Sequence, residues 1–207
     1  PPFAMTTYSE YGYTVSTGDP EHDGDGYIWK AFDSDVSTYW FSHPGTGDAD
    51  STYLDGDPRG NDGQSITDSN GTTHTGSWGK IEFPHKFVLN YLEVQGGTPV
   101  SLYYPHNPNN YVILGSNDDE VWDLLSTRTG ASPTTDGMTT GGTQIDRHTV
   151  NAQKAYKYII FLVTQISTVL TGAREFIIAA LRLYGHKEND TTRFPVSSTV
   201  LKYPHVA

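Results

Sequence analysis

The most informative segment of the sequence is Tyr111-Val112-Ile113-Leu114-Gly115-Ser116-Asn117-Asp118, with Trp122 four residues further on. Its apolar first half favours a buried strand, and the Gly-Ser-Asn-Asp that follows is a strong turn signal. We expect Gly115 to supply a backbone conformation that a side chain would forbid. We expect Asn117-Asp118 to form a turn in which the carboxylate caps backbone amides. The segment predicts a β-strand that ends in a tight turn.

The rest of the 207-residue chain continues this pattern of short strands and turns. Gly (21) and Pro (12) are abundant, 13% of the residues are aromatic and only 18% are charged, which is typical of an all-β domain with long loops. Further strands are expected at 11–16, 78–83, 87–94 (after a break at Pro84), 122–125, 156–163 and 176–184. Residues 27–32 form a compact apolar island that suits one helical turn, and 127–143 are expected to be loop. This pattern indicates a sandwich or a barrel.

The net charge of −11 is concentrated in one quarter of the chain. Residues 17–69 contain twelve acidic residues against only Lys30 and Arg59. Such a surface repels phosphate backbones, so we expect no nucleic-acid partner. Two interpretations of the aspartates stay open: solvated loops that keep the domain soluble, or ligands for a hard cation.

The sequence carries none of the patterns that mark common catalytic sites. It has no cysteine, which excludes disulfides, thiol catalysis and zinc-thiolate sites. Its eight histidines lack metal-ligand spacing, and it has no nucleophile elbow, phosphate loop or dinucleotide fingerprint. No apolar run approaches the roughly 20 residues of a membrane span. We expect a protein that is not an enzyme. Two glycosylation sequons begin at Asn70 and Asn189.

Five blocks in order give the chain a family resemblance. Ala31-Phe32-Asp33-Ser34-Asp35-Val36-Ser37-Thr38-Tyr39-Trp40 resembles the A-F-D-x-x-x-x-T-x-W signature of discoidin (coagulation-factor C-type) domains, which are galactose-binding-like. The same family's remaining blocks are similar to residues 76–83, 111–118 with Trp122, 157–161 and the closing Leu-Tyr-Gly within 181–185. The variant with long Gly/Thr inserts is similar to modules repeated in large surface proteins of marine microbes and algal giant viruses.

The resemblance implies a jelly-roll β-sandwich of about eight antiparallel strands. The sandwich is expected at residues 8–185, with 1–7 as a linker from a preceding module and 186–207 as an extended C-terminal linker segment. Trp40, Trp78 and Trp122 are expected in the core, because large aromatic side chains fill sandwich interiors.

The resemblance also implies a calcium site at the loop from Lys30 to Thr38. Its ligands are expected from Lys30, Asp33, Asp35 and Thr38, with Ser37 as a further oxygen donor. The family's closing glutamate stands five residues before the last glycine, where this chain has Ala180. Losing a carboxylate lowers calcium affinity, so binding is expected to be weak. Residues 23–26, Asp-Gly-Asp-Gly, are a second cation candidate that is better explained as a turn.

The resemblance further implies that ligands meet the loops at one end of the sandwich, where sugar sites combine a stacking aromatic with polar partners. The expected ligand-binding residues are aromatic and histidine side chains in loops: Tyr27, Phe41, His43, Tyr53, Tyr104 and His106. These features predict glycan recognition or adhesion at an extracellular or virion surface. Membrane insertion is not expected, because the acidic loops would repel anionic lipid.

The alternative is a structural repeat that assembles with neighbouring copies and binds no ligand. Residues 1–4 (Pro-Pro-Phe-Ala) and 204–207 (Pro-His-Val-Ala) share a pattern that a tandem array would produce. The apolar segment 194–207 is then expected to run extended along the module or its neighbour, because apolar side chains need a surface to bury against.

Overall fold

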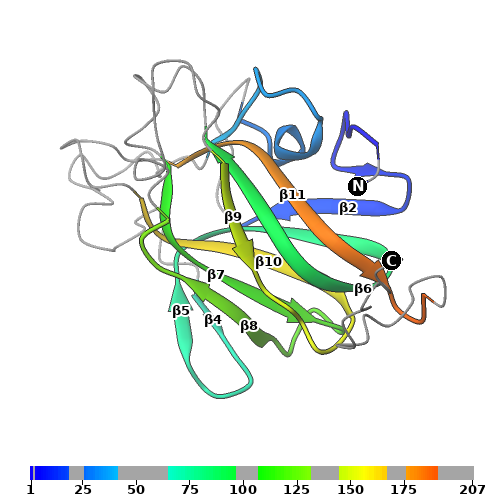
Figure 1. The fold of residues 1–207 in the computed structure, drawn as a ribbon, viewed down its shortest axis with the longest axis vertical. Coiled ribbons are helices and arrows are strands. Elements are labelled where there is room, and N and C mark those ends of the chain that lie inside the picture. The colour runs from blue at the N-terminus through cyan, green and yellow to red at the C-terminus, as the bar shows by residue number, and fades with distance from the viewer. Residues whose placement is uncertain are drawn as a thin grey trace, which may run out of the picture.

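A computed structural model describes residues 1, 3–18, 26–41, 65–96, 107–131, 145–166 and 176–190. This part of the chain is almost entirely β (Figure 1). Its elements are β1 Ser9–Glu10, β2 Tyr13–Thr17, the 3₁₀ helix η1 Ile28–Phe32, β3 Trp40–Phe41, β4 Ser65–Thr67, β5 Thr73–Thr75, β6 Ser77–Gly96, β7 Pro108–Ser116, β8 Asp123–Arg128, β9 Ile145–Thr149, β10 Tyr156–Ile166 and β11 Ile177–Lys187.

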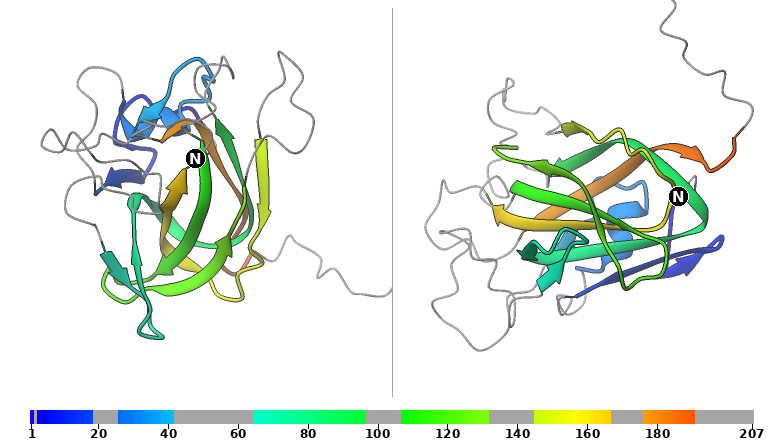
Figure 2. Two further views of the ribbon diagram at one scale, coloured as in Figure 1. Left: turned by 90° about the vertical axis from the view of Figure 1, so that its left-hand side faces the viewer. Right: turned by 90° about the horizontal axis from the view of Figure 1, so that it is seen from below.

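The long strand β6 belongs to both layers of an antiparallel sandwich. Its first part pairs with β2 and β10 in a layer of order β1-β2-β6-β10-β7-β8. Its last part, from Phe87, pairs with β11 on one side and β9 on the other, and β3 extends β11. Figure 2 shows the two layers from two further directions. The predicted all-β sandwich is confirmed.

Pro84 marks the place where β6 passes from one layer to the other. The sequence predicted a strand break here, and that prediction is wrong, because β6 runs without interruption from Ser77 to Gly96. Proline lacks an N–H, so it suits a bend at which the strand changes partners. The pairing of β6 with β10 is irregular between Tyr156 and Tyr158, close to this bend.

The strand ends divide the sandwich into two ends with different character. Phe41, Gly96 and Ile145 lie at one end, since Ile177 pairs with Phe41, Ile178 with Gly96 and Gln95 with Ile145. In the other layer Pro108 pairs with Ile166. We call the end of the sandwich that holds these strand ends the Gly96 end. In the sequence, these strand ends are joined through residues 42–64, 97–106, 132–144 and 167–175. The Pro84 end is opposite, with the turn at Asp118 and the turn at Gly12.

The core lies between the layers. The three tryptophans that were predicted to lie in it differ in how far they are buried. Trp40 is fully buried and meets the Phe176 ring edge-on, with centroids 4.7 Å apart. Trp122 is buried in a smaller cluster on the outer face of β7 and β10. Trp78 is only partly buried in that cluster, with the Lys80 ammonium 5.8 Å from its ring. The prediction of burial therefore holds for Trp40 and Trp122, although only Trp40 lies between the layers, and it was too strong for Trp78.

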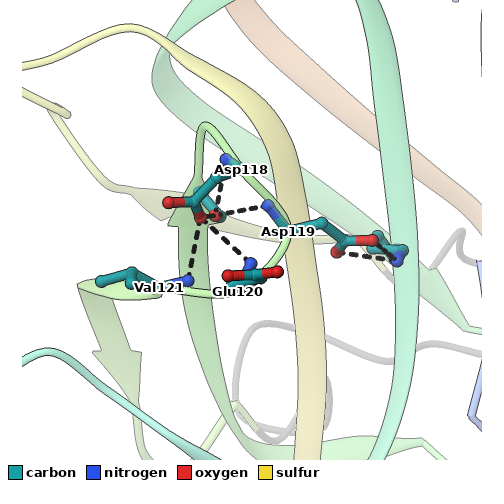
Figure 3. Close-up of polar contacts among 6 residues, drawn as sticks. Asp118, Asp119, Glu120 and Val121 are labelled. Carbon is teal, nitrogen blue, oxygen red and sulfur yellow. Dashed lines mark hydrogen bonds and ion pairs between the residues drawn. The ribbon is translucent and has the colours of Figure 1, made fainter.

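The turn after β7 forms as predicted (Figure 3). Asp118 Oδ1 accepts hydrogen bonds from the N–H groups of Glu120 (3.0 Å) and Val121 (2.9 Å). Asp119 has a left-handed φ of 64°, and its carboxylate pairs with Lys80 at 2.6 Å. Gly115 plays a different part from the one expected. Its φ is not positive, and a Cβ there would lie 2.7 Å from the Tyr156 ring, so space rather than conformation requires glycine.

The structure adds strands that the sequence did not predict: the short strands β1 and β3, the β4–β5 hairpin and the edge strand β9. The β4–β5 hairpin projects from the sandwich in Figure 1, and Asp68 in its turn forms an isolated bridge with Trp122. The edge strand β9 lies beyond the stretch that was expected as loop. Met5, within the proposed linker 1–7, is fully buried, and β11 continues two residues past Gly185. Residues 194–207 lie outside the described residues.

Candidate functional site

The 3₁₀ helix η1 holds an aromatic and basic cluster at the surface. Its buried side chains anchor it to the core: Ile28, Ala31 and Phe32. The Tyr27 ring stacks on the Trp29 ring, with centroids 6.0 Å apart and planes 16° apart. The Lys30 ammonium lies 5.7 Å from the Tyr27 centroid and 5.8 Å from the Trp29 centroid. The cluster therefore combines aromatic ring surface with a positive charge. Carbohydrate sites use aromatic ring surface together with polar side chains.

Phe41 comes to the same corner of the molecule from β3. Its backbone N–H donates to the Gly26 carbonyl at 3.2 Å, which ties β3 to the residue before Tyr27. The Phe41 ring is half-buried and meets the Tyr39 ring edge-on at 5.8 Å. The structure therefore brings the backbone next to Tyr27 into contact with Phe41 at the Gly96 end, while the Tyr27 ring contacts Trp29 and, with centroids 6.2 Å apart, Tyr8. Trp29 was missed because residues 27–32 looked like a wholly apolar island.

The other four predicted ligand-binding residues lie outside the described residues: His43, Tyr53, Tyr104 and His106. The described residues that border their segments are Phe41, Gly96 and Asn107, all at the Gly96 end. The prediction of these four residues stays untested.

The loop after η1 gathers oxygen atoms around the Thr38 hydroxyl. Thr38 Oγ1 contacts Asp33 Oδ2 and lies 3.0 Å from the Asp35 carbonyl oxygen. Asp33 Oδ1 accepts the Asp35 N–H at 2.8 Å. Asp35 Oδ1 accepts both the hydroxyl (2.6 Å) and the N–H (2.9 Å) of Ser37, and these bonds hold the pKa of Asp35 below its ordinary value.

This donor set suits a hard cation in part. A carboxylate, a carbonyl and a hydroxyl are the ligand types that calcium takes, and here they converge on one point. The Lys30 ammonium lies over the aromatic rings, so a ligand from Lys30 would be its backbone carbonyl oxygen, and this ligand stays a prediction. Ala180 on β11 contributes only a methyl group. Among the described residues, no three His, Cys, Asp or Glu side chains come together as a metal site would require.

A polar cluster joins the edge strands β8 and β9. Asp146 accepts the Tyr111 hydroxyl at 2.6 Å and Arg128 Nη2 at 2.7 Å. Ser126 Oγ lies 2.7 Å from His148 Nε2. Burial, assisted by the Arg128 charge, lowers the pKa of His148. These contacts hold the two layers together at one side of the sandwich, so we interpret them as structural.

The outer face of β9, β6 and β11 carries a second charged cluster. Glu93 is buried between Arg147 on β9 and Arg182 on β11, and it accepts Arg147 Nε at 2.9 Å and the Tyr184 hydroxyl at 3.0 Å. Burial acts to raise the pKa of Glu93, but the bonds from Arg147 and Tyr184 outweigh it and lower this pKa. The Tyr91 and Tyr184 rings stack at 4.4 Å.

The comparisons with known proteins identify the architecture. The structure matches CBM32-3 from a family 31 glycoside hydrolase of Clostridium perfringens with a TM-score of 0.58, over 84% of this chain and 92% of that one, at 17% identity. The chain has the galactose-binding-like, or discoidin, fold. A second match is CpGH89CBM32-5 from the same organism, in complex with GalNAc-β-1,3-galactose (TM-score 0.52, 11% identity, covering 84% and 96%).

A third match is the family 32 module of Clostridium perfringens NanJ, in complex with galactose (TM-score 0.51, 14% identity, covering 83% and 93%). No protein-family model matches the sequence, and no curated protein matches it. At these identities the structural matches establish the fold alone, and the predicted fold resemblance is confirmed. Within the described residues, no helix is long and apolar enough to cross a membrane.

Proposed function

We propose that this domain is a non-catalytic module that binds glycans at its Gly96 end. The observation that carries the proposal is the discoidin fold with the aromatic residues Tyr27 and Phe41 close together along the chain trace at its Gly96 end. Structural neighbours were solved with galactose or a GalNAc-galactose disaccharide bound. Sugar rings stack their apolar faces on aromatic side chains, while hydroxyl groups take polar partners.

A glycan array followed by titration calorimetry with galactose-type sugars tests this proposal. Phe41→Ala and Tyr27→Ala are expected to weaken binding about tenfold or more, since each removes aromatic contact area. Tyr11→Ala is the matched control, because Tyr11 is 62% exposed but lies beside Gly12 at the Pro84 end. Absence of any glycan signal, or equal losses in all three variants, would contradict the proposal.

The setting that we propose is an extracellular or virion surface, where the module serves attachment or adhesion. The lack of cysteine permits such a setting but does not require it. We also propose that calcium binds weakly at the Asp33–Thr38 loop, supported by the oxygen atoms that converge on Thr38. Millimolar calcium is then expected to raise the melting temperature relative to chelator, and an unchanged melting temperature would count against the site.

A structural repeat without ligand binding is the second candidate. One observation favours it: Phe3 and Tyr11 are each 62% exposed and their rings lie 5.2 Å apart, an apolar pair open to a neighbouring copy. In this proposal residues 1–7 and 186–207 connect successive modules around the sandwich 8–185. Ordered end-to-end contacts in an imaged particle or filament, together with no glycan binding, would support it.

A further inference from the structure

Asn70 lies in the turn of the β4–β5 hairpin, which projects from the sandwich (Figure 1). It is the third residue of a tight turn, because the Gly71 N–H donates to the Asp68 carbonyl oxygen at 2.9 Å. Asn70, Gly71 and Thr72 are exposed, and together they form one of the two Asn-x-Thr sequons of the chain. A Cβ at Gly71 would meet nothing within 4 Å, so the space beside the sequon is open.

The buried carboxylate of Asp68 holds this turn in place. Asp68 Oδ1 accepts hydrogen bonds from the N–H groups of Asn70 (2.9 Å) and Thr72 (3.0 Å). Asp68 Oδ2 lies 2.9 Å from His74 Nε2. Asp68 therefore fixes the backbone of the sequon and leaves its side chains at the surface.

The two side chains that define the sequon have no partners. Among the described residues, neither the Asn70 amide nor the Thr72 hydroxyl makes a hydrogen bond. The side-chain amide nitrogens of Asn110 and Asn117 are, in contrast, bonded within the fold. Asn70 thus presents an unbonded amide nitrogen, with an unbonded hydroxyl two residues further on.

The hairpin turn lies against the start of β8. The Ser69 N–H donates to the Trp122 carbonyl oxygen at 2.7 Å, and Ser69 Oγ donates to Asp123 Oδ1 at 2.9 Å. β8 begins at Asp123, directly after the turn that belongs to the Pro84 end. A group attached to Asn70 is therefore held away from the Gly96 end, where sugar binding is proposed.

We propose that Asn70 is an acceptor for N-linked glycosylation in a eukaryotic secretory pathway, and that its sugar chain leaves the Gly96 end open. In the transfer, Asn70 Nδ2 forms a bond to the anomeric carbon of a sugar carried on a lipid diphosphate. The bond from that carbon to the diphosphate oxygen breaks, and the amide gives up one proton as the lipid diphosphate leaves. Thr72 supplies the hydroxyl that the transferase recognises. The inference rests on the proposed extracellular setting and not on the proposed ligand.

Secretion of the whole chain from cultured animal cells, followed by mass spectrometry of intact glycopeptides, tests the inference. Most copies of the peptide around Asn70 are expected to carry a sugar chain, and the intact mass distinguishes this from simple conversion of Asn70 to aspartate. Asn70→Gln and Thr72→Ala are expected to remove the sugar chain. Thr72→Ser, which keeps the hydroxyl, and Asn189→Gln, which removes the second sequon, are the matched controls and are expected to keep it.

An unmodified Asn70 in the secreted protein, or a sugar chain there that persists in Thr72→Ala, would overturn the inference. Calorimetry with galactose then compares the glycosylated protein with Asn70→Gln, and equal binding is expected. Binding by Asn70→Gln alone would overturn the claim that the sugar chain leaves the Gly96 end open. Failure of both forms to bind galactose-type sugars would contradict the proposed function and leave the acceptor at Asn70 intact.

Discussion

His148 is a side chain whose protonation makes the stability of the fold depend on pH. It lies on β9 with Ser126, Arg128, Asp146 and the Tyr111 ring around it, and burial favours its neutral form. The folded-state pKa is thus below the ordinary value near 6.5. The unfolded chain binds the proton more readily, so the stabilisation is complete above pH about 6.5 and is lost as the pH falls below it.

We therefore expect the free energy of unfolding to fall between pH 7.5 and 5.5, and to fall less in His148→Gln, which keeps a hydrogen-bond acceptor without the charge. Urea unfolding at both pH values measures this. His85, whose pKa is also lowered by burial, contributes in the same direction, so His85→Gln is the comparison variant. An unchanged pH dependence in His148→Gln would refute the assignment of its environment.

Alanine variants of Trp40 and Trp78 test which of the two side chains belongs to the core, through the loss in the free energy of unfolding. Trp40→Ala is expected to cost roughly 3–5 kcal/mol, because it empties a fully buried site against Phe176. Trp78→Ala is expected to cost about 1–2 kcal/mol, because the ring is only partly buried. Urea unfolding gives both values, with Trp40→Phe as a milder core variant if Trp40→Ala does not fold. Equal losses in the two alanine variants would show that Trp78 belongs to the core after all.

The residue predictions succeeded where side-chain chemistry acts locally. The Asp118 cap followed from Asn-Asp in a turn, and the burial of Trp40 from its size. They failed where the outcome depends on what lies across the fold. Gly115 is required by the Tyr156 ring, and Trp78 faces outward, neither of which a local pattern contains. At the candidate site, Tyr27 and Phe41 were predicted, but their stacking and backbone partners were not.

Among the elements, the turn from β7 to β8 has a residue in a conformation that usually favours glycine. Asp119 adopts a left-handed φ of 64° there. Aspartate tolerates this conformation better than most residues, and its pairing with Lys80 at 2.6 Å adds a contact that glycine lacks. The turn thus holds Asp119 in a conformation that is easier for glycine, and in return Asp119 forms an ion pair that glycine could not form.

Asp119→Ala is expected to destabilise the fold by about 1 kcal/mol, since alanine keeps the strained conformation and loses the pair. Asp119→Gly is expected to stay within about 0.5 kcal/mol of the wild type, because the relief of strain offsets the lost contact. Thermal unfolding of both variants distinguishes them. Equal destabilisation by alanine and glycine would mean that the ion pair alone maintains the turn.

The strands rich in Ile, Val and aromatic residues were predicted because they are buried on both faces, as β7 and β10 are. The β4–β5 hairpin and β9 were not predicted, and the reason is the same for both. The β4–β5 hairpin is built from Ser and Thr with cross-strand hydroxyl contacts, and β9 points Asp146 and His148 toward Arg128 and Ser126. Because the side chains of these strands are polar and hydrogen-bond across strands, their sequence lacks the alternation of apolar and polar residues that predicts a strand. The continuity of β6 through Pro84 likewise depends on the strands that pair with β6, and not on the β-propensity of its own residues.

In the molecule as a whole, the two ends of the sandwich differ in architecture, and the net charge is concentrated in one part of the sequence. Residues 70–207 contain equal numbers of acidic and basic residues, so the whole net charge of −11 arises from residues 1–69. The Pro84 end is closed by the bend of β6 and the turn at Asp118. The Gly96 end carries the aromatic corner of Tyr27 and Phe41, and it is the end to which the proposed glycan site belongs.

NMR mapping can show whether glycans bind at the Gly96 end. Galactose is titrated into the ¹⁵N-labelled domain and amide shifts are followed residue by residue. We expect shifts of the amides of Tyr27, Phe41, Gly96 and Ile177, with the amides around Pro84 and Asp118 unchanged. Shifts confined to the Pro84 end, or no shifts with any galactose-type sugar, would contradict it.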